Sequence, residues 1–273
     1  MIIKENHSDS DSDKDQIRRF LFFGDIIGSP GRNKVCTYLP ELLEKENIFF
    51  AAVQGENIAG GIGITEDTAK QLFKAGVDCI TTGNHVWKHK EFYDYLGQEN
   101  RILRPANYPD GVPGIGFAVY EKQGTKIGLI NLEGRVFMQP KEDPFKIGRE
   151  IVEKMQKETC NIFVDFHAEA TSEKKTLGYY LSKSVTACLG THTHVQTADE
   201  QIINGHTAYI TDIGMVGSSD SVIGFEKDEI TKYILLSTPQ KFKVAKDYIT
   251  ANCVIVDFDM RYGQAKSIIR YNF

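Results

Sequence analysis

Residues 19–32 read RFLFFGDIIGSPGR, and this stretch decides the type of fold. The run Phe20–Phe23 is apolar and of strand length, and it stops at Gly24. The turn-rich segment Gly28–Gly31 comes next, and apolar residues then recur at helical spacing over Asn33–Glu46. The stretch therefore predicts a buried strand, a tight turn and a helix, which is how a β-α-β unit begins.

The same alternation continues along the chain. Phe49–Val53 and Val77–Thr82 are strand-like, and between them Thr65 is the expected N-cap of a helix. Strands that alternate with helices predict right-handed crossovers and a mostly parallel sheet covered on both faces. The second half is richer in strands, and its Asn204-Gly205 pair is a hairpin signal. The strands expected there are Gly116–Tyr120, Lys126–Leu132, Ile162–Phe166, Ala187–Gly190, Gln201–Ile203, Thr207–Ile210, Cys253–Phe258 and Lys266–Tyr271, and the expected helix is Phe145–Lys157.

No linker rich in proline or serine divides the sequence, and no internal repeat is visible. We therefore expect a single α/β domain over residues 19–273, built from two packed sheets. Residues 1–18 are expected to form a flexible acidic extension, because His7–Asp15 alternates aspartate with serine and offers nothing apolar to bury.

The composition narrows the class of protein. The 273 residues are 41% hydrophobic and carry 32 basic against 37 acidic side chains, a net charge of −5. This balance argues against a protein that coats long nucleic acids. No run reaches the roughly 20 apolar residues of a membrane span, and the N-terminus lacks the apolar core of a signal peptide. Five scattered cysteines without a CxxC pair predict free thiols, with Cys79 and Cys188 buried, and hence a cytoplasmic protein.

Polar side chains occur where the predicted strands end. Ligands of open α/β sheets bind outside the carboxyl ends of the strands, so these side chains should share one rim. They are Asp25, Glu56, Asn57, Asn84, His85, His167, His192 and His194.

Each of these residues also has a structural interpretation. Asp25 could cap a turn, and His167 could be a hydrogen-bonded core histidine. His192 and His194 could be a solvated pair, although in an extended segment both imidazoles would point to the same side. Trp87, close to His85, could pack beneath the site or stack on a base. The structural interpretation is hard to sustain for the whole set, because four of the seven histidines fall on this rim.

The types of side chain indicate what binds there. Imidazole, carboxylate and amide donors without thiolate suit iron, manganese or zinc. Without His85, the rim offers seven candidate ligands. Seven ligands with one shared carboxylate suit two ions about 3.5–4 Å apart. Such a pair would hold a phosphate group without a cluster of basic side chains, which reconciles a phosphate substrate with an acidic protein.

The order Gly-Asp, Gly-Glu-Asn, Gly-Asn-His, His and Gly-Thr-His-Thr-His resembles the calcineurin-like metallophosphoesterases. The longer strings at residues 24–32, 165–173 and 190–199 resemble one bacterial branch, the YmdB-like family of dinuclear cyclic-nucleotide phosphodiesterases. The resemblance runs from about Arg19 to the C-terminus. It implies a four-layer αββα sandwich of two mixed sheets flanked by helices. It also implies hydrolysis of 2′,3′- and 3′,5′-cyclic nucleotides at an iron or manganese pair, with zinc or magnesium as further candidates.

The resemblance, together with the ligand types, implies roles for single residues. A metal-bridging hydroxide would attack phosphorus, and His85 would be the general acid. Asp25-Ile26-Ile27 replaces the usual Asp-x-His of the wider superfamily, and Asn57 could supply the missing ligand. The expected ligands are Asp25, Asn57 and His194 for one ion, Asn84, His167 and His192 for the other, and Glu56 as the bridge. What orients His85 is left open by the sequence.

Two other functions fit the same residues. One is a phosphomonoesterase or nuclease on the same centre, and the other is a non-catalytic, metal-binding regulatory protein. The expected partners are a small phosphodiester and further copies of this chain in a homo-oligomer, with neither a long nucleic acid nor a membrane.

Overall fold

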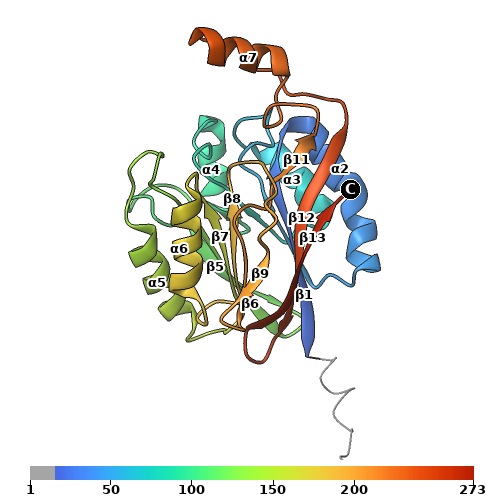
Figure 1. Ribbon diagram of the computed structural model, residues 1–273. Coiled ribbons are helices and arrows are strands. Elements are labelled where there is room, and N and C mark those ends of the chain that lie inside the picture. Colours follow the sequence, from blue (N-terminus) through green and yellow to red (C-terminus); the bar gives the residue numbers. More distant parts are fainter. Residues whose placement is uncertain (1–15) are drawn as a thin grey trace, which may run out of the picture.

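Strand β1 (Ile17–Ile26) lies inside a seven-stranded mixed sheet, and its carboxyl end carries Asp25 (Figure 1). The structure, a computed structural model, describes residues 16–273. The strand order is β13-β12-β11-β1-β2-β3-β4. β1 pairs in parallel with β2 and β11 and antiparallel with β12. The other strands are β2 (Phe50–Gln54), β3 (Cys79–Thr81), β4 (Ile102–Leu103), β11 (Met215–Ser218), β12 (Ile249–Asp259) and β13 (Gln264–Asn272).

A second mixed sheet of six strands has the order β5-β6-β7-β8-β10-β9. Strands β6, β7, β8 and β10 are parallel, while β5 and β9 form antiparallel edges. The bounds are β5 (Phe117–Lys122), β6 (Thr125–Glu133), β7 (Ile162–His167), β8 (Ala187–Thr191), β9 (Gln201–Ile203) and β10 (Thr207–Ile210).

Helices cover the outer face of each sheet. Residues of α2 (Gly28–Lys45), α3 (Glu66–Lys74) and α4 (Tyr93–Leu96) share a buried cluster with the seven-stranded sheet. A short 3₁₀ turn, Lys90–Phe92, precedes α4. On the other side, α5 (Pro144–Met155) and α6 (Thr171–Leu181) pack on the six-stranded sheet. The predicted arrangement of two mixed sheets flanked by helices is therefore confirmed (Figure 1).

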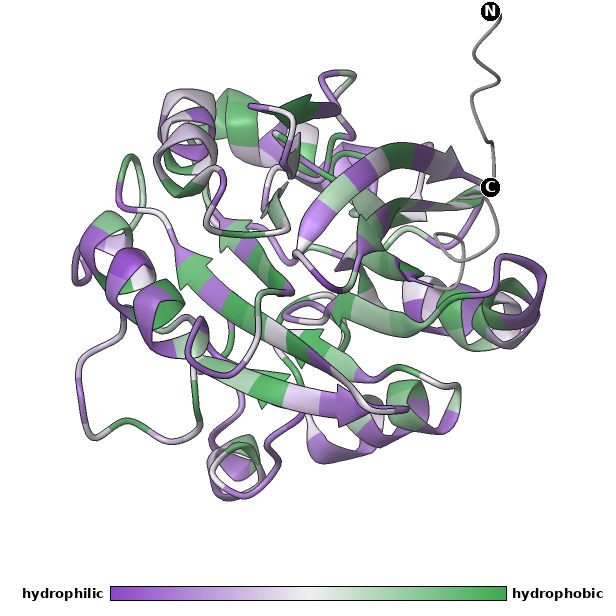
Figure 2. Ribbon diagram, turned by 90° about the horizontal axis from the view of Figure 1, so that it is seen from below, coloured by the Kyte–Doolittle hydropathy of each residue, from purple (hydrophilic) through white to green (hydrophobic). Residues whose placement is uncertain are grey.

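The alternation of side chains in β1 shows how the layers are held together. Phe20 and Phe22 belong to the cluster between the two sheets, and the Phe20 ring stacks on Phe163 of β7 with 3.8 Å between centroids. Leu21 and Phe23 point the other way, toward α2 and α3. Because both faces of β1 are buried, its sequence is continuously apolar. Figure 2 shows the same division, with hydrophobic strands inside and hydrophilic outer faces on the helices.

Several expectations can be compared with these elements. Thr65 caps α3 as predicted, since its side chain accepts a hydrogen bond from the Thr68 amide. Cys79 and Cys188 are buried as predicted. The sequence did not predict α6 or α7 (Lys227–Leu236); α7 buries none of its residues and projects from the body (Figure 1).

The flexible acidic extension predicted for residues 1–18 lies outside the described residues except at 16–18, and β1 already begins at Ile17. Within the described residues, no helix has the length and apolar character needed to cross a membrane.

Candidate metal centre

The carboxyl ends of strands from both sheets meet at one rim, where all eight predicted side chains lie. Asp25 is the last residue but one of β1, whereas Glu56-Asn57 and Asn84-His85 follow β2 and β3 of the same sheet. The six-stranded sheet contributes the other three residues. They are His167 at the end of β7 and His192 and His194 after β8.

One predicted ligand set is closely assembled around His167. Its Nε2 atom lies 3.1 Å from Oδ1 of Asn84 and 3.0 Å from Nδ1 of His192. Oε1 of Glu56 is 3.4 Å from the same nitrogen. Ligand atoms of Glu56, His167 and His192 lie within 4.8 Å of one another. These four donors thus face one small volume, as a shared cation requires.

The rear of the His167 ring is fixed by buried polar side chains that the sequence analysis did not single out. Nδ1 of His167 lies 3.1 Å from Nε2 of Gln54 and 3.0 Å from Oγ1 of Thr191. The Thr191 hydroxyl in turn donates to Asp165 at 2.7 Å. Such partners behind a ligand fix the orientation of its ring. The spacing Asp165-x-His167 on a strand was the only signal in the sequence, since residues i and i+2 share one face.

Burial and charge act in opposite directions on the two neighbouring imidazoles. Burial opposes protonation of His167, but the carboxylate of Glu56 outweighs it and raises the pKa of His167 above its ordinary value. Burial, reinforced by the His167 charge, lowers the pKa of His192. Two imidazole nitrogens 3.0 Å apart cannot both carry protons on the line between them. The Glu56 carboxylate therefore favours positive charge at the place where a metal ion would supply it.

Asp25 provides the second observation that fits a metal. Its side chain is fully buried, and Oδ1 has no hydrogen-bond partner among the described residues. Burial raises the pKa of Asp25, as expected for a carboxylate removed from water. Oδ1 lies 3.7 Å from Nε2 of His194, and Oδ2 accepts the His192 amide at 3.0 Å. A cation at Oδ1 would satisfy a group that is otherwise costly to bury.

His194 is oriented for the same volume. Its Nδ1 lies 2.9 Å from the Ile223 carbonyl oxygen, which can only accept a hydrogen bond. The Nδ1–H therefore donates, and in a neutral ring Nε2 is left free to bind a metal. Asn57 is joined to this group less directly, because its amide donates to Oε1 of Glu56 at 3.1 Å. The oxygen and nitrogen donors present thus fit one or more metal ions.

His85 has the ring orientation that the sequence left open. Its Nδ1 lies 2.8 Å from Oδ1 of Asn57 and 3.0 Å from Oε1 of Glu56, both of which are acceptors. The His85 amide donates to Oε2 of Glu56 at 3.0 Å. Nδ1–H therefore points into the rim and the Nε2 edge away from it, where the side chain is 28% exposed.

The Thr191–His194 turn differs from the expected extended segment. β8 ends at Thr191, and His192 and His194 have φ values of 102° and 65°, in the left-handed region. Their rings consequently approach different neighbours, His167 and Asp25. The expectation of an extended pair was therefore wrong, although both rings reach the site.

A buried ion pair holds this strained turn. Oδ2 of Asp212 accepts the Thr193 amide at 3.0 Å and is paired with Nζ of Lys174 at 2.6 Å. The Gly214 amide donates to the other oxygen of Asp212 at 2.8 Å. The Lys174 and Asp212 side chains are 1% and 0% exposed. The sequence gives no sign of this role for Lys174, because a lysine in a helix is usually exposed to solvent.

A cavity of about 290 Å³ opens beside these side chains. Trp87 is not part of its lining and instead packs edge-on against Tyr93 and Tyr108, each 5.4 Å away between centroids. Of the two interpretations of Trp87, packing is confirmed. The cavity is lined by Asn84, His85, Lys88, Tyr108, Phe137, Met138, Gln139, Lys141 and His192.

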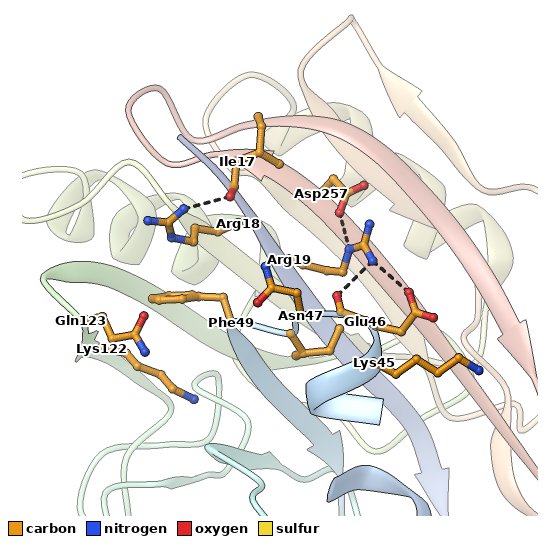
Figure 3. Close-up of a pocket in the computed structure, with 11 residues that line it drawn as sticks. Ile17, Arg18, Arg19, Lys45, Glu46, Asn47, Phe49, Lys122, Gln123 and Asp257 are labelled. Carbon is orange, nitrogen blue, oxygen red and sulfur yellow. Dashed lines mark hydrogen bonds and ion pairs between the residues drawn. The ribbon is translucent and has the colours of Figure 1, made fainter. Parts of the chain in front are cut away.

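Another hollow, of about 560 Å³, lies at the opposite end of β1 and contains none of the rim residues (Figure 3). Three of the basic side chains in its lining, Arg18, Arg19 and Lys122, are engaged with neighbours. Arg19 donates to Asp257 and Glu46, and Lys122 to Asp78. The smaller cavity is the one that is lined by rim residues, namely Asn84, His85 and His192.

The fold and the donors on its rim place the chain in the metallophosphoesterase class of phosphoric ester hydrolases. The chain belongs to the YmdB-like protein family, whose sequence profile matches residues 21–271. It is 44% identical over 252 residues to the 2′,3′-cyclic-nucleotide 2′-phosphodiesterase of Bacillus subtilis, covering 92% of this chain and 96% of that protein.

Two solved structures are similar over nearly the whole chain. One is a hypothetical protein from Thermus thermophilus, with a TM-score of 0.88, 37% identity, and coverage of 93% of this chain and 98% of the other. The second is described as a novel phosphatase from Mycoplasma pneumoniae, with a TM-score of 0.89, 32% identity, and coverage of 94% and 93%.

Proposed function

We propose that this protein is a phosphodiesterase that hydrolyses small cyclic nucleotides, of both the 2′,3′- and 3′,5′-cyclic types. The observation that carries the proposal is the position of His85. Its Nδ1 edge is held by Asn57 and Glu56, and the ring lines the cavity together with Asn84 and His192. The name of the Bacillus subtilis relative supports the 2′,3′-cyclic type in particular.

The proposed cofactor is a pair of metal ions, iron or manganese, with zinc or magnesium also accommodated by these donors. Glu56 is the proposed bridge between the two ions. Asp25, Asn57 and His194 would hold one ion, and Asn84, His167 and His192 the other. Two bound ions supply positive charge for the phosphate group and lower the pKa of the attacking water.

The proposed role of His85 is that of general acid. A protonated ring whose Nδ1–H is held by Asn57 presents its Nε2–H to the cavity. From there it would transfer that proton to the ribose oxygen as the P–O bond breaks, so that an alcohol departs instead of an alkoxide. Positioned acids of this kind typically contribute about 10²–10⁴-fold to the rate.

A second candidate, a phosphomonoesterase or nuclease on the same centre, is favoured by the description of the Mycoplasma pneumoniae structure as a phosphatase. A non-catalytic, metal-binding regulator is disfavoured by His85. A structural metal site has no need of a partly exposed histidine that is hydrogen-bonded to two acceptors beside the ligands.

Metal analysis combined with a substrate panel tests the proposal. Cyclic mononucleotides, linear dinucleotides and phosphomonoesters would be compared at equal concentration with the manganese-loaded protein. We expect two metal equivalents and the highest kcat/KM with a cyclic mononucleotide. Preference for a monoester would support the phosphatase, preference for linear dinucleotides would support the nuclease, and no turnover would support the regulator.

We also propose that the protein is a cytoplasmic homo-oligomer. Its exposed helix α7 supports self-association, because Ile234, Leu235 and Leu236 are 69%, 75% and 63% exposed. Light scattering at micromolar concentration should give a multiple of 30.7 kDa. A monomeric mass would contradict the proposed oligomer. Recovery of the protein with the membranes after cell fractionation would contradict the proposed cytoplasmic location.

A further inference from the structure

The loop after β6 holds an aromatic ring in solvent at the mouth of the cavity. Phe137 is 89% exposed, the highest value among the large hydrophobic side chains described, and it lines the cavity together with His85 and Asn84. Its φ of 63° lies in the left-handed region, which favours glycine or asparagine over a bulky side chain. Neither burial nor local conformation therefore accounts for a phenylalanine here.

The backbone around this ring is fixed although the ring is free. The buried carboxylate of Glu173 accepts the Arg135 amide at 3.0 Å and the Val136 amide at 3.1 Å. A hydrogen bond of 3.2 Å from the Met138 amide to the Arg135 carbonyl closes the turn. The Gly134 amide donates at 3.0 Å to the carbonyl of His167, so the loop is tied directly to the rim. The ring is thus presented from a rigid support.

Several other residues that line the cavity are polar, and one of them is held by a buried ion pair. Lys141 forms a nearly buried ion pair with Glu133, with side chains 6% and 0% exposed, and its Nζ lies 4.9 Å from the centroid of Tyr108. Gln139 and Lys88 add exposed polar groups to the lining. One apolar face beside hydrogen-bonding groups matches a nucleobase, which has an apolar face and polar edges.

We propose that this cavity is the nucleobase subsite and that Phe137 is the surface on which the base stacks. The proposal rests on the proposed function, since it assumes that the phosphate lies at the metal donors. His85 and His192 belong to both the rim and the cavity, so the ribose would bridge them and the base would reach Phe137. Stacking does not depend strongly on which base is bound, because every base has a π-face. Purine and pyrimidine nucleotides should therefore both bind.

The direct test measures product binding to the manganese-loaded protein by calorimetry. Adenosine 3′-monophosphate carries the base, whereas inorganic phosphate lacks it. Phe137→Ala should raise the Kd of the nucleotide by about 5- to 150-fold, the range that loss of one base stack gives, and leave that of phosphate unchanged. Phe137→Trp should restore the affinity. Tyr262→Ala, at an exposed aromatic in the β12–β13 turn, should change neither Kd.

A second measurement separates stacking from a structural role. Phe137→Gly removes the ring and also relieves the left-handed conformation, so its Tm should equal or exceed that of the parent while the Kd of the nucleotide still rises. A lower Tm, equal weakening of nucleotide and phosphate, or unchanged nucleotide binding in Phe137→Ala would each overturn the assignment of Phe137.

Kinetics distinguish this proposal from the function on which it rests. Glycerol 1,2-cyclic phosphate has the five-membered cyclic diester of a 2′,3′-cyclic nucleotide but no base. If the parent protein hydrolyses neither cyclic ester, the proposed function is refuted. If both are hydrolysed, Phe137→Ala should lower kcat/KM for the nucleotide alone, and an equal effect on both would refute the base subsite while leaving the function in place.

Discussion

Oδ1 of Asn57 lies 2.8 Å from Nδ1 of His85, so a proposed metal ligand and the proposed general acid are in direct contact. An amide oxygen has two lone pairs and can accept from the ring while it binds a cation. Asn57 can therefore fix the tautomer and direction of His85 in the metal-loaded protein. This relationship links the metal position to the proton donor and motivates the first prediction.

His85→Ala should retain its metals and lose about 10²–10⁴-fold in kcat with a cyclic nucleotide. The loss should be much smaller with bis(p-nitrophenyl) phosphate, because a phenolate departs without a proton. Steady-state rates with the two substrates, together with metal content, provide the measurement. His89→Ala, at a histidine outside the proposed ligand set, is the control. Loss of a metal, or equal slowing of both substrates, would show that His85 is a ligand or binds phosphate.

Glu56→Ala should remove metal from both positions, because the carboxylate is the proposed shared ligand. Glu66→Ala changes an exposed glutamate that pairs with Lys70 on α3, so it should keep the full complement. Elemental analysis of both purified variants gives the stoichiometry. Two equivalents retained by Glu56→Ala would rule out the bridging assignment.

Lys174→Met should reduce the free energy of unfolding by about 3–5 kcal/mol, the usual cost of removing one partner of a buried ion pair and leaving the other charge unpaired. The double variant Lys174→Met/Asp212→Leu should recover part of this stability. The double variant should still bind metal more weakly than the parent protein, because the Thr193 amide then lacks its acceptor. Urea unfolding and metal titration measure the two quantities.

The matched control for the buried pair is Lys122→Met. Its pair with Asp78 is 36% and 22% exposed, so the expected loss is only about 0–1 kcal/mol. Equal losses for the two lysine variants would argue against a special role of the Lys174–Asp212 pair.

The buried thiols should make stability depend on alkaline pH. Burial raises the pKa of Cys79 and of Cys188 to about 12 from an ordinary value of 9.0. The unfolded chain therefore releases these protons first, and the free energy of unfolding should fall as pH rises from about 9 toward 12.

Variants Cys79→Ala and Cys188→Ala should show a shallower fall above pH 9, measured by urea unfolding at several pH values. In the folded protein at pH 8, iodoacetamide should modify Cys160, which is exposed, and spare both buried thiols. A pH slope unchanged in the variants would show that other groups, such as tyrosines, account for the fall.

The layers of the fold were predictable because burial leaves a periodic trace. The run Phe20–Phe23 is apolar at every position, and both faces of β1 are indeed buried. Helix α6 was missed because two of its inward residues, Glu173 and Lys174, are charged. Their partners, the Arg135 and Val136 amides and the Asp212 carboxylate, come from other segments of the chain, and such long-range pairing leaves no local pattern.

In the site, too, features with a local sequence pattern could be predicted, and features that depend on long-range contacts could not. All eight rim residues could be predicted from strand ends and side-chain types, and the structure brings them to one edge. The partner of His85 was not predictable, because Asn57 is 28 positions away in sequence and the contact depends on the loop after β2. His192 and His194 have left-handed φ values, and the Thr193 amide between them is held by Asp212, which lies on a different loop.

The order of strands in the seven-stranded sheet has a consequence for biosynthesis. β1 is the first of the described strands to be made, yet two of its three neighbours, β11 and β12, are among the last. Until residues 215–259 have left the ribosome, Asp25 sits on a strand with one open side, and the histidines after β8 have only just emerged. Metal loading should therefore wait until β11 and β12 have paired with β1, and a nascent chain halted before β11 should bind metal weakly even though it already contains every proposed ligand.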